Sequence, residues 1–328
     1  MRAPIALTLA LLFGAAPAAA AAAIVPGPLA DLQTELSAMS RRAPGNVAMQ
    51  VQDLSTGITS SVNPSASMPA ASTIKIPVMV EVFRQLAAQN FDLNTTLTLT
   101  RADKDWGSGS LSGQPVGRLY TVSQLLTAMI TVSDNTATNM LIRLVGRSNI
   151  NMEMTSLGLE HTRLSDYIRS SGNSIRRALR TSPADMVALL NAMAHERLID
   201  AWSSRQMIVI LSGQRHNGLL PAPLPAGIPI AHKTGTLHDT LNDVGIVYAD
   251  AEPYVIAVMT TNLPTLNSGR QFIRKVSKVA YDALQRFGSW KINNDTLVPG
   301  APGVTPPPSN PPLWDQAVPQ PEPSPPDG

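Results

Sequence analysis

The sequence predicts an α/β fold of the α+β type. Its antiparallel sheet is built from N- and C-terminal strands flanked by helices, and an all-helical subdomain is inserted between them. Near the start, residues 47–54 alternate apolar and polar side chains, and a Thr-Gly turn precedes a second short strand at 58–62. Near the end, residues 244–249 and 254–261 are two apolar stretches joined by a turn-rich segment. Because the chain between these pairs has helical periodicity, we expect the strands of both ends to meet in one sheet.

Three helices can be placed from their apolar spacing and their first residues. The first follows Thr121, a candidate N-cap, and its apolar residues recur at helical spacing: Val122, Leu125, Leu126, Met129 and Ile130. A second begins at Ser182-Pro183, since serine is a favoured cap and proline is favoured in the first turn. The last runs from about residue 270 to residue 286, with its apolar side chains along one side.

Composition excludes several classes of function. The chain has 328 residues, of which 44% are apolar and 15% charged, so it can form a sizeable core and is not disordered throughout. It has no cysteine, which excludes disulfides, thiolate nucleophiles, Fe–S clusters and cysteine-ligated zinc. Its 25 basic and 23 acidic residues leave a net charge of only +2, so nothing indicates a nucleic-acid partner.

The two ends of the chain differ from the middle. Residues 1–23 have one positive charge, an apolar stretch and a run of alanines, which is the pattern of a secretory signal peptide. The alternative is a retained membrane anchor, but the apolar stretch is shorter than the ~20 residues needed to span a bilayer. We therefore expect an exported protein, periplasmic or secreted, with no transmembrane span.

The C-terminal segment, residues 299–328, contains twelve of the 28 prolines. Proline at this density favours extended, solvated polyproline II over helix or sheet. The segment is predicted to be a disordered tail, and a spacer or a ligand for an unidentified proline-binding partner is the alternative. The remaining residues, 28–292, are predicted to form one catalytic domain.

Ser72-Thr73-Ile74-Lys75 is the first of three motifs that carry chemistry. A spacing of three places the serine and the lysine on the same side of a helical turn. A serine hydroxyl is a poor nucleophile until a base takes its proton, and a lysine can act as that base only when its pKa is lowered. Alone the motif is weak, although Ser72 is the only serine followed by lysine three places on.

The other two motifs are Ser133-Asp134-Asn135 and Lys233-Thr234-Gly235. The first can be read simply as a polar turn that caps the next helix, and the lysine of the second as an exposed strand residue. Alternatively, Lys233 holds a carboxylate and lowers the pKa of Lys75, and Gly235 allows a substrate to approach the backbone.

The three motifs together resemble the signature of the class A β-lactamase superfamily, which includes penicillin-binding proteins. Their order is the same, and the motifs begin 61 and 100 residues apart. Four other segments resemble the family: Trp106-Gly107-Ser108-Gly109-Ser110, Thr136-Ala137-Thr138-Asn139, Leu157-Gly158-Leu159 with Thr162-Arg163-Leu164, and Asp243-Val244-Gly245-Ile246. The resemblance covers nearly all of residues 28–292.

The resemblance implies a role for each motif residue. Ser72 would be the acylated nucleophile, and its backbone N–H, with that of Thr236 or Leu237, would form the oxyanion hole. Lys75 would take the serine proton, Ser133 would relay a proton to the leaving nitrogen, and Asn135 would hold Lys75 and the substrate amide. Lys233 and Thr234 would bind the substrate carboxylate beside Gly235. Trp106 would lie at the mouth of the site, and its alternative is a structural aromatic residue in a surface loop.

One departure from the family pattern lies in residues 162–183. In class A β-lactamases a glutamate of this loop activates the water that releases the acyl-enzyme, and here the loop contains no glutamate. Counted forward from Leu164, the family position falls on Ile168, and counted back from Pro183 it falls near Asp166. Asp166 is the only acidic residue of the loop and lies among arginines, which favours an ion pair over a water-positioning role.

The expected function is an exported, monomeric serine hydrolase that hydrolyses the β-lactam amide slowly, as in β-lactam catabolism and antibiotic resistance. A D-alanyl-D-alanine carboxypeptidase or transpeptidase, acting on a D-alanyl peptide, is one alternative, and a non-catalytic protein that binds β-lactams or cell wall is another. No cofactor is indicated. The five histidines have no metal-ligand spacing, so no metal site is expected, and His232 is predicted to pack on the sheet face opposite Lys233.

Overall fold

The computed structural model describes residues 27–170, 175–293 and 306. The predicted signal peptide and the predicted proline-rich tail, apart from Pro306, lie outside the described residues. Among the helices described, none is both long and apolar enough to cross a bilayer.

A five-stranded antiparallel sheet, in the order β2-β1-β10-β9-β8, forms the centre of the fold. Its strands are β1 (Asn46–Asp53), β2 (Thr59–Val62), β8 (Ile230–Leu237), β9 (Thr240–Val247) and β10 (Tyr254–Thr261). N-terminal β1 pairs with C-terminal β10 along eight residues, from Asn46 opposite Thr261 to Asp53 opposite Tyr254. The prediction that both ends of the chain meet in one antiparallel sheet is confirmed.

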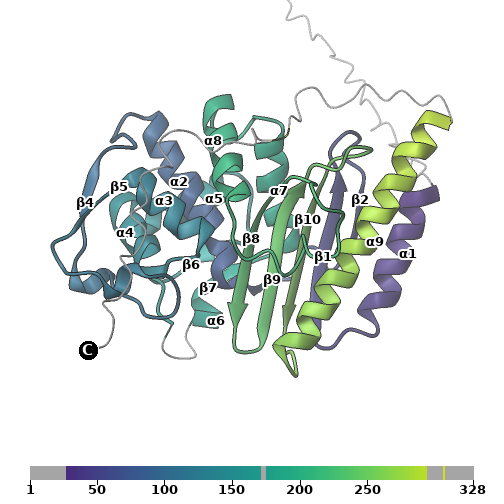
Figure 1. Ribbon diagram of the computed structural model, residues 1–328, viewed down its shortest axis with the longest axis horizontal. Helices are drawn as coiled ribbons and strands as arrows, with labels where there is room; N and C mark the ends of the chain where they lie inside the picture. Colours follow the sequence, from purple (N-terminus) through teal and green to yellow (C-terminus); the bar gives the residue numbers. More distant parts are fainter. Residues whose placement is uncertain (1–26, 171–174, 294–305, 307–328) are drawn as a thin grey trace, which may run out of the picture.

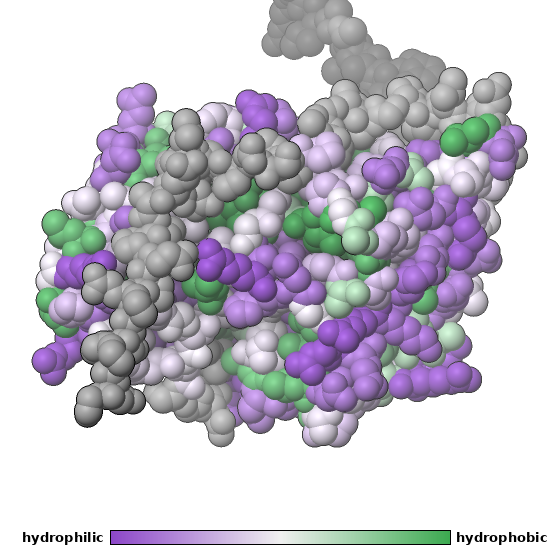
Figure 2. Space-filling model, viewed as in Figure 1, coloured by the Kyte–Doolittle hydropathy of each residue, from purple (hydrophilic) through white to green (hydrophobic). Residues whose placement is uncertain are grey.

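Two helices, α1 (Gly27–Ser40) and α9 (Leu266–Asn293), lie side by side on one side of this sheet (Figure 1). Their apolar side chains and those of the adjacent sheet face form one buried layer, which includes Leu32, Leu36, Ile256, Ile273 and Phe287. On the face shown in Figure 2, hydrophilic residues predominate over the outer surface of α9. Helix α9 is longer than the predicted 270–286, and α1 was not predicted.

The helical part of the molecule lies on the other side of the sheet (Figure 1). It contains α2 (Lys75–Ala87), α3 (Val122–Thr131), α4 (Asn135–Val145), α5 (Arg147–Ser156), α6 (Ile175–Ala178), α7 (Pro183–Ala194) and α8 (Ala201–Ser212). Short strands connect these helices: β3 (Met68–Pro69), β4 (Thr96–Thr98), β5 (Leu119–Thr121), β6 (Arg163–Leu164) and β7 (Leu179–Thr181). Thr121 and Ser182 cap α3 and α7 as predicted, each accepting a hydrogen bond from a backbone N–H three residues on.

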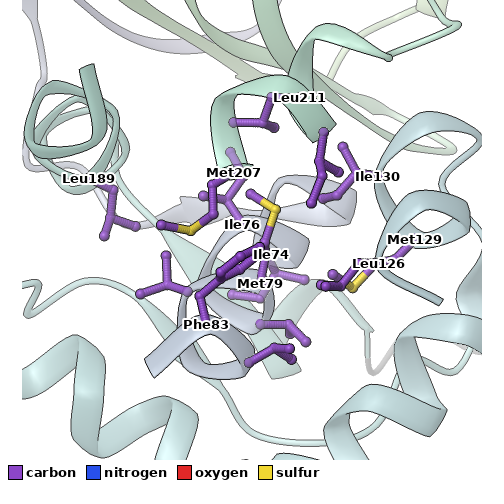
Figure 3. Packing of buried hydrophobic residues seen from close by; sticks show 14 of the residues in the cluster. Ile74, Ile76, Met79, Phe83, Leu126, Met129, Ile130, Leu189, Met207 and Leu211 are labelled. Carbon is purple, nitrogen blue, oxygen red and sulfur yellow. The ribbon is translucent and has the colours of Figure 1, made fainter. Parts of the chain in front are cut away.

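Helix α2 is the centre of the larger core. Figure 3 shows its apolar residues packed against those of α3, α7 and α8, with these side chains labelled: Ile74, Ile76, Met79, Phe83, Leu126, Met129, Ile130, Leu189, Met207 and Leu211. Because this packing surrounds α2, it fixes the turn that leads into the helix, and that turn carries Ser72.

Strand β9 begins at Thr240, four residues before the predicted start at Val244. The prediction was wrong there because Asn242 and Asp243 are polar, a composition typical of a loop. Both are fully buried, and their side chains bond within the fold. The Asn242 amide donates to the carbonyls of Pro69 and Ala70, and Asp243 accepts from the backbone N–H of Leu220.

Candidate active site

Ser72 lies in the short 3-10 turn Ala71–Ile74, which continues directly into α2. Its side chain is half-buried and lines a cleft of about 760 Å³. Ala71 has a φ of 48°, in the left-handed region that non-glycine residues rarely adopt. Strain of this kind often marks functional sites, and here it lies next to the candidate nucleophile.

Lys75, one helical turn after Ser72, is fully buried. Its Nζ donates to the carbonyl O of Ser133 at 2.6 Å, to Ser133 Oγ at 2.9 Å and to Asn135 Oδ1 at 2.8 Å. Burial and, to a lesser degree, the charge of Lys233 hold the pKa of Lys75 well below its ordinary value. A buried amine with a lowered pKa is the form of lysine that can accept a proton from serine.

Ser133, Asp134 and Asn135 connect α3 to α4, and the three side chains have different tasks. Asp134 caps α4 by accepting from Ala137 N at 2.8 Å, so the helix-cap interpretation is correct for this residue. Ser133 has a φ of 59°, and it and Asn135 both contact Lys75. The motif is therefore both a helix cap and part of the lysine's environment.

Lys233, on β8, lies on the other side of the Ser133 hydroxyl. Its Nζ donates to Ser133 Oγ at 3.2 Å and to the carbonyl O of Thr234 at 3.0 Å. Burial lowers the pKa of Lys233 to about 7, although the charge of Asp243 acts in the opposite direction. The Ser133 hydroxyl thus bridges two buried lysines, which is an arrangement suited to proton transfer.

Strand β8 passes close to the Ser72 turn, and Gly235 makes this possible. A Cβ placed on Gly235 would lie 2.9 Å from the carbonyl O of Ala70 and 3.1 Å from Ser72 N. Thr234 and Thr236, on either side of Gly235, both line the cleft. All three motifs predicted from the sequence therefore meet at one cleft.

Of three other residues considered in the sequence analysis, Ile168 lies in the cleft, whereas Asp166 and Trp106 do not line it. Ile168 is buried and lines the cleft. Asp166 is 56% exposed, is not among the cleft-lining residues and lies 3.7 Å from Arg147. Trp106 is 74% exposed and also does not line the cleft, and Lys104 Nζ lies 5.8 Å from its ring centroid.

His232 is buried and is not among the cleft-lining residues. Its Nδ1 lies 2.9 Å from Asp243 Oδ1, and its Nε2 lies 3.0 Å from Asn217 Oδ1. A Cβ on Gly245, in the adjacent strand, would lie 2.6 Å from His232 Cβ. His232 is therefore a packed and hydrogen-bonded histidine, in the role predicted for it.

Sequence reasoning missed three polar residues at the site. Ser170 and His216 line the cleft, and Asp105 is buried and binds both Asn135 and Ser170. Burial, together with the charge of Lys233, lowers the pKa of His216 and so favours the neutral imidazole. The sequence signal for Asp105 was its position directly before the Trp106-Gly107-Ser108-Gly109-Ser110 segment.

The cleft combines parts that nucleophilic catalysis requires: a serine, a buried amine, a bridging hydroxyl and the edge strand β8, whose Thr234 and Thr236 line the cleft. Within the described ranges, no three His, Asp or Glu side chains are grouped in a way that could hold a metal ion. Among the described cleft-lining residues there is no Asp or Glu.

Comparison with solved structures shows close likeness in fold. The β-lactamase from Sphaerobacter thermophilus DSM 20745 is 32% identical with a TM-score of 0.71, over 78% of this chain and 97% of that one. The structure of PBP-A is 30% identical with a TM-score of 0.73, over 78% of this chain and 96% of that one. An ancestral class A β-lactamase is 26% identical with a TM-score of 0.70, over 77% of this chain and 99% of that one.

The model of the β-lactamase enzyme family matches residues 31–284. This range contains the five-stranded sheet, the helical part and every residue of the cleft. The fold and the match agree with the three motifs that the sequence carries. The chain belongs to the β-lactamase enzyme family and is a serine hydrolase of the class A type.

Proposed function

We propose that the protein is an exported enzyme that β-lactams acylate at Ser72 and that releases the product slowly. The observation that carries the proposal is Ile168, an apolar side chain that lines the cleft and that is one of the two candidates for the family position of the water-activating glutamate. Asp166, the only acidic residue of that loop, points elsewhere and contacts Arg147. The pattern of residues 1–23 supports export.

In the acylation step, Lys75 takes the proton of Ser72, and the serine oxygen attacks the carbonyl carbon of the lactam. The backbone N–H group of Ser72, with that of Thr236 or Leu237, stabilises the oxyanion. The lactam C–N bond then breaks, and the nitrogen receives a proton through the Ser133 hydroxyl. Lys233 and Thr234 bind the substrate carboxylate.

Release requires water to attack the ester carbonyl, and a positioned general base typically accelerates such a step by about 10²–10⁴-fold. An isoleucine cannot act as that base. The acyl-enzyme should therefore accumulate, because its formation uses groups that are present and its hydrolysis lacks one.

An intact-mass time course with benzylpenicillin tests the proposal. We expect a mass increase of one penicillin that persists long after acylation is complete. An adduct that clears as fast as it forms would contradict slow release, and a protein that forms no adduct would contradict acylation itself.

A D-alanyl-D-alanine peptidase is the second candidate. The same serine and lysine chemistry serves both reactions. The described cleft-lining residues include no Asp or Glu that could act as the water-activating base of a β-lactamase, and this favours the peptidase. One similar solved structure, 29% identical with a TM-score of 0.73, is a PBP-A variant in an acyl-enzyme complex with penicillin G. Turnover of a D-alanyl-D-alanine peptide faster than that of benzylpenicillin would make this the main activity.

The acylation rate constant at low substrate should depend on pH through Lys233. Its pKa of about 7 means that the amine is charged below pH 7 and loses its charge above it, so binding of the substrate carboxylate weakens as pH rises through 7. The rate at low substrate reports groups of the free enzyme, so this fall should be visible there. Lys233→Arg keeps the charge and should remove the fall. If the arginine variant shows the same fall, another group is responsible.

Gly235→Ala should impair acylation because the added methyl would push β8 away from Ser72. Overpacking of this kind typically costs about 1–3 kcal/mol of stability. Gly113→Ala is the matched control, since nothing lies within 4 Å of a Cβ at that position. Thermal unfolding and the acylation rate should both change for Gly235→Ala and neither for Gly113→Ala. Normal acylation by a folded Gly235→Ala protein would show that the close approach is not needed.

A further inference from the structure

Asp105 is a buried carboxylate that lies between the catalytic motifs and the loop that carries Ile168. It is 6% exposed and directly precedes the exposed Trp106. Its Oδ1 accepts from Asn135 Nδ2 at 2.7 Å and from Gly107 N at 3.0 Å. Its Oδ2 accepts from Ser170 N at 2.7 Å and from Ser170 Oγ at 2.9 Å.

These four donors occupy the acceptor sites of a carboxylate, which number about four. Burial alone would raise the pKa of Asp105, but the hydrogen bonds from Ser170, Asn135 and Gly107 outweigh it and hold that pKa below its ordinary value. Asp105 is therefore a fixed anion with no free lone pair, and this excludes it as the general base that release lacks.

The first consequence of this arrangement concerns Asn135. An ionised carboxylate only accepts hydrogen bonds, so Asn135 must turn its NH₂ group toward Asp105. The amide oxygen of Asn135 then faces the other way, where it accepts from Lys75 Nζ at 2.8 Å. The orientation of the amide beside Lys75 is thus set by a residue thirty positions earlier in the chain.

The second consequence concerns the loop. Asp105 Oδ2 accepts from Ser170, two residues after Ile168. Asn139 accepts from the backbone N–H of Ile168 and donates to its carbonyl O. A Cβ on Gly107 would lie 2.2 Å from Ser170 Cβ, so the two segments are in direct contact. The hydrogen bonds that Asn139 and Asp105 make with this loop therefore hold Ile168 in its position in the cleft.

We infer that Asp105 is a positioning residue that orients Asn135 toward Lys75 and ties the Ile168 loop to the same site. It does not line the cleft, so it acts through Asn135 and Ser170. The inference rests on the proposed function only for its effect on acylation, since the orientation of Asn135 and its effect on Lys75 can be measured without a substrate.

Asp105→Asn tests the inference because it keeps the shape and removes the charge and one acceptor. Neither the Gly107 N–H nor the Ser170 N–H can turn away, so the new NH₂ group must face a donor whichever way it points. If this NH₂ group faces Ser170, the hydrogen bonds that hold the Ile168 loop are lost. If it faces Asn135, it favours a flipped Asn135 amide that presents its own NH₂ group to Lys75. Because misplacing a catalytic group by about 1 Å can cost ~10²-fold, we expect acylation to slow by 10- to 100-fold.

The direct readout is the titration of Lys75. The charged groups that act on this amine are Lys233 on β8, Asp134 at the start of α4, and Asp105. His216 lies near enough to be affected by both lysines, and burial and these charges lower its pKa. Removing the Asp105 charge takes away a group that stabilises the ammonium form, so the pKa of Lys75 should fall. We expect this fall to be smaller than the one that loss of a direct ion pair would cause, because Asn135 lies between the two groups.

The experiment is a ¹³C NMR titration of protein labelled at lysine Cε, combined with acylation rates. The chain has six lysines, and Lys75→Arg identifies the signal. Asp103→Asn is the matched control: Asp103 is also buried, but its carboxylate binds Arg143 and Thr100 instead of the site. We expect Lys75 to titrate lower in Asp105→Asn and unchanged in Asp103→Asn.

An unchanged Lys75 titration in folded Asp105→Asn would overturn the inference, whether or not penicillin acylates the wild-type protein. If wild-type protein is not acylated but the titration shifts as expected, the proposed function fails and the positioning role stands. If Asp105→Asn does not fold, Asp105→Glu takes its place. It keeps the charge and should preserve the wild-type titration of Lys75, and a clear shift in folded Asp105→Glu would overturn the inference.

Discussion

Replacing Ser72 with alanine should reduce acylation by benzylpenicillin by about 10⁶-fold, as loss of the nucleophile does in other serine hydrolases. Alanine lacks the oxygen that forms the ester, and the cleft offers no replacement at the same point. Ser108→Ala is the matched control, since Ser108 lines the same cleft and its hydroxyl contacts only the carbonyl O of Val132, at 3.5 Å. Intact-mass measurement over the same time course should show full labelling of the control and none of Ser72→Ala.

Labelling of Ser72→Ala at a rate near that of the wild-type protein would contradict the assignment of the nucleophile. Peptide mapping of the labelled protein would then identify the residue that reacts.

Replacing Ile168 with glutamate should shorten the lifetime of the acyl-enzyme by about 10²–10⁴-fold, the usual contribution of a positioned general base. The side chain at position 168 lines the cleft together with Ser72, and Asn139 holds its backbone in place. A carboxylate at this position can accept a proton from water that attacks the ester. The measurement is the decay of the penicillin adduct after free penicillin has been removed.

Two controls separate base catalysis from a change of shape. Ile168→Gln has the same size as the glutamate variant but no base, so its adduct should persist. Asp166→Asn removes the only carboxylate of the loop, and because Asp166 lies outside the cleft its adduct should decay at the wild-type rate. Faster decay in Ile168→Gln, or slower decay in Asp166→Asn, would contradict the account of release.

Individual strands of the sheet and the three motifs were predictable from sequence because each has a pattern of residues close together in the chain. Alternation in residues 47–54 identifies β1, and Ser72-Thr73-Ile74-Lys75 places two catalytic groups on one turn by spacing alone. The start of β9 was not predictable, because Asn242 and Asp243 are polar and become strand residues only through buried partners.

In residues 162–183, too, the sequence alone could not decide which residue faces the cleft. Counting along the chain left Ile168 and Asp166 as two candidates for one family position, and the structure places Ile168 in the cleft and Asp166 outside it. Asp105 could not be assigned, because its partners Asn135 and Ser170 lie 30 and 65 residues away. Its one local signal, the position directly before Trp106, does not indicate which residues it binds.

A pre-steady-state measurement with a chromogenic cephalosporin separates acylation of Ser72 from release of the product. We expect a rapid burst of about one equivalent of opened lactam per protein, followed by a much slower steady rate, because acylation is intact and release lacks its base. A progress curve that shows no burst and stays linear through many turnovers would contradict slow release. That result would mean that release keeps pace with acylation, through a group other than residue 168.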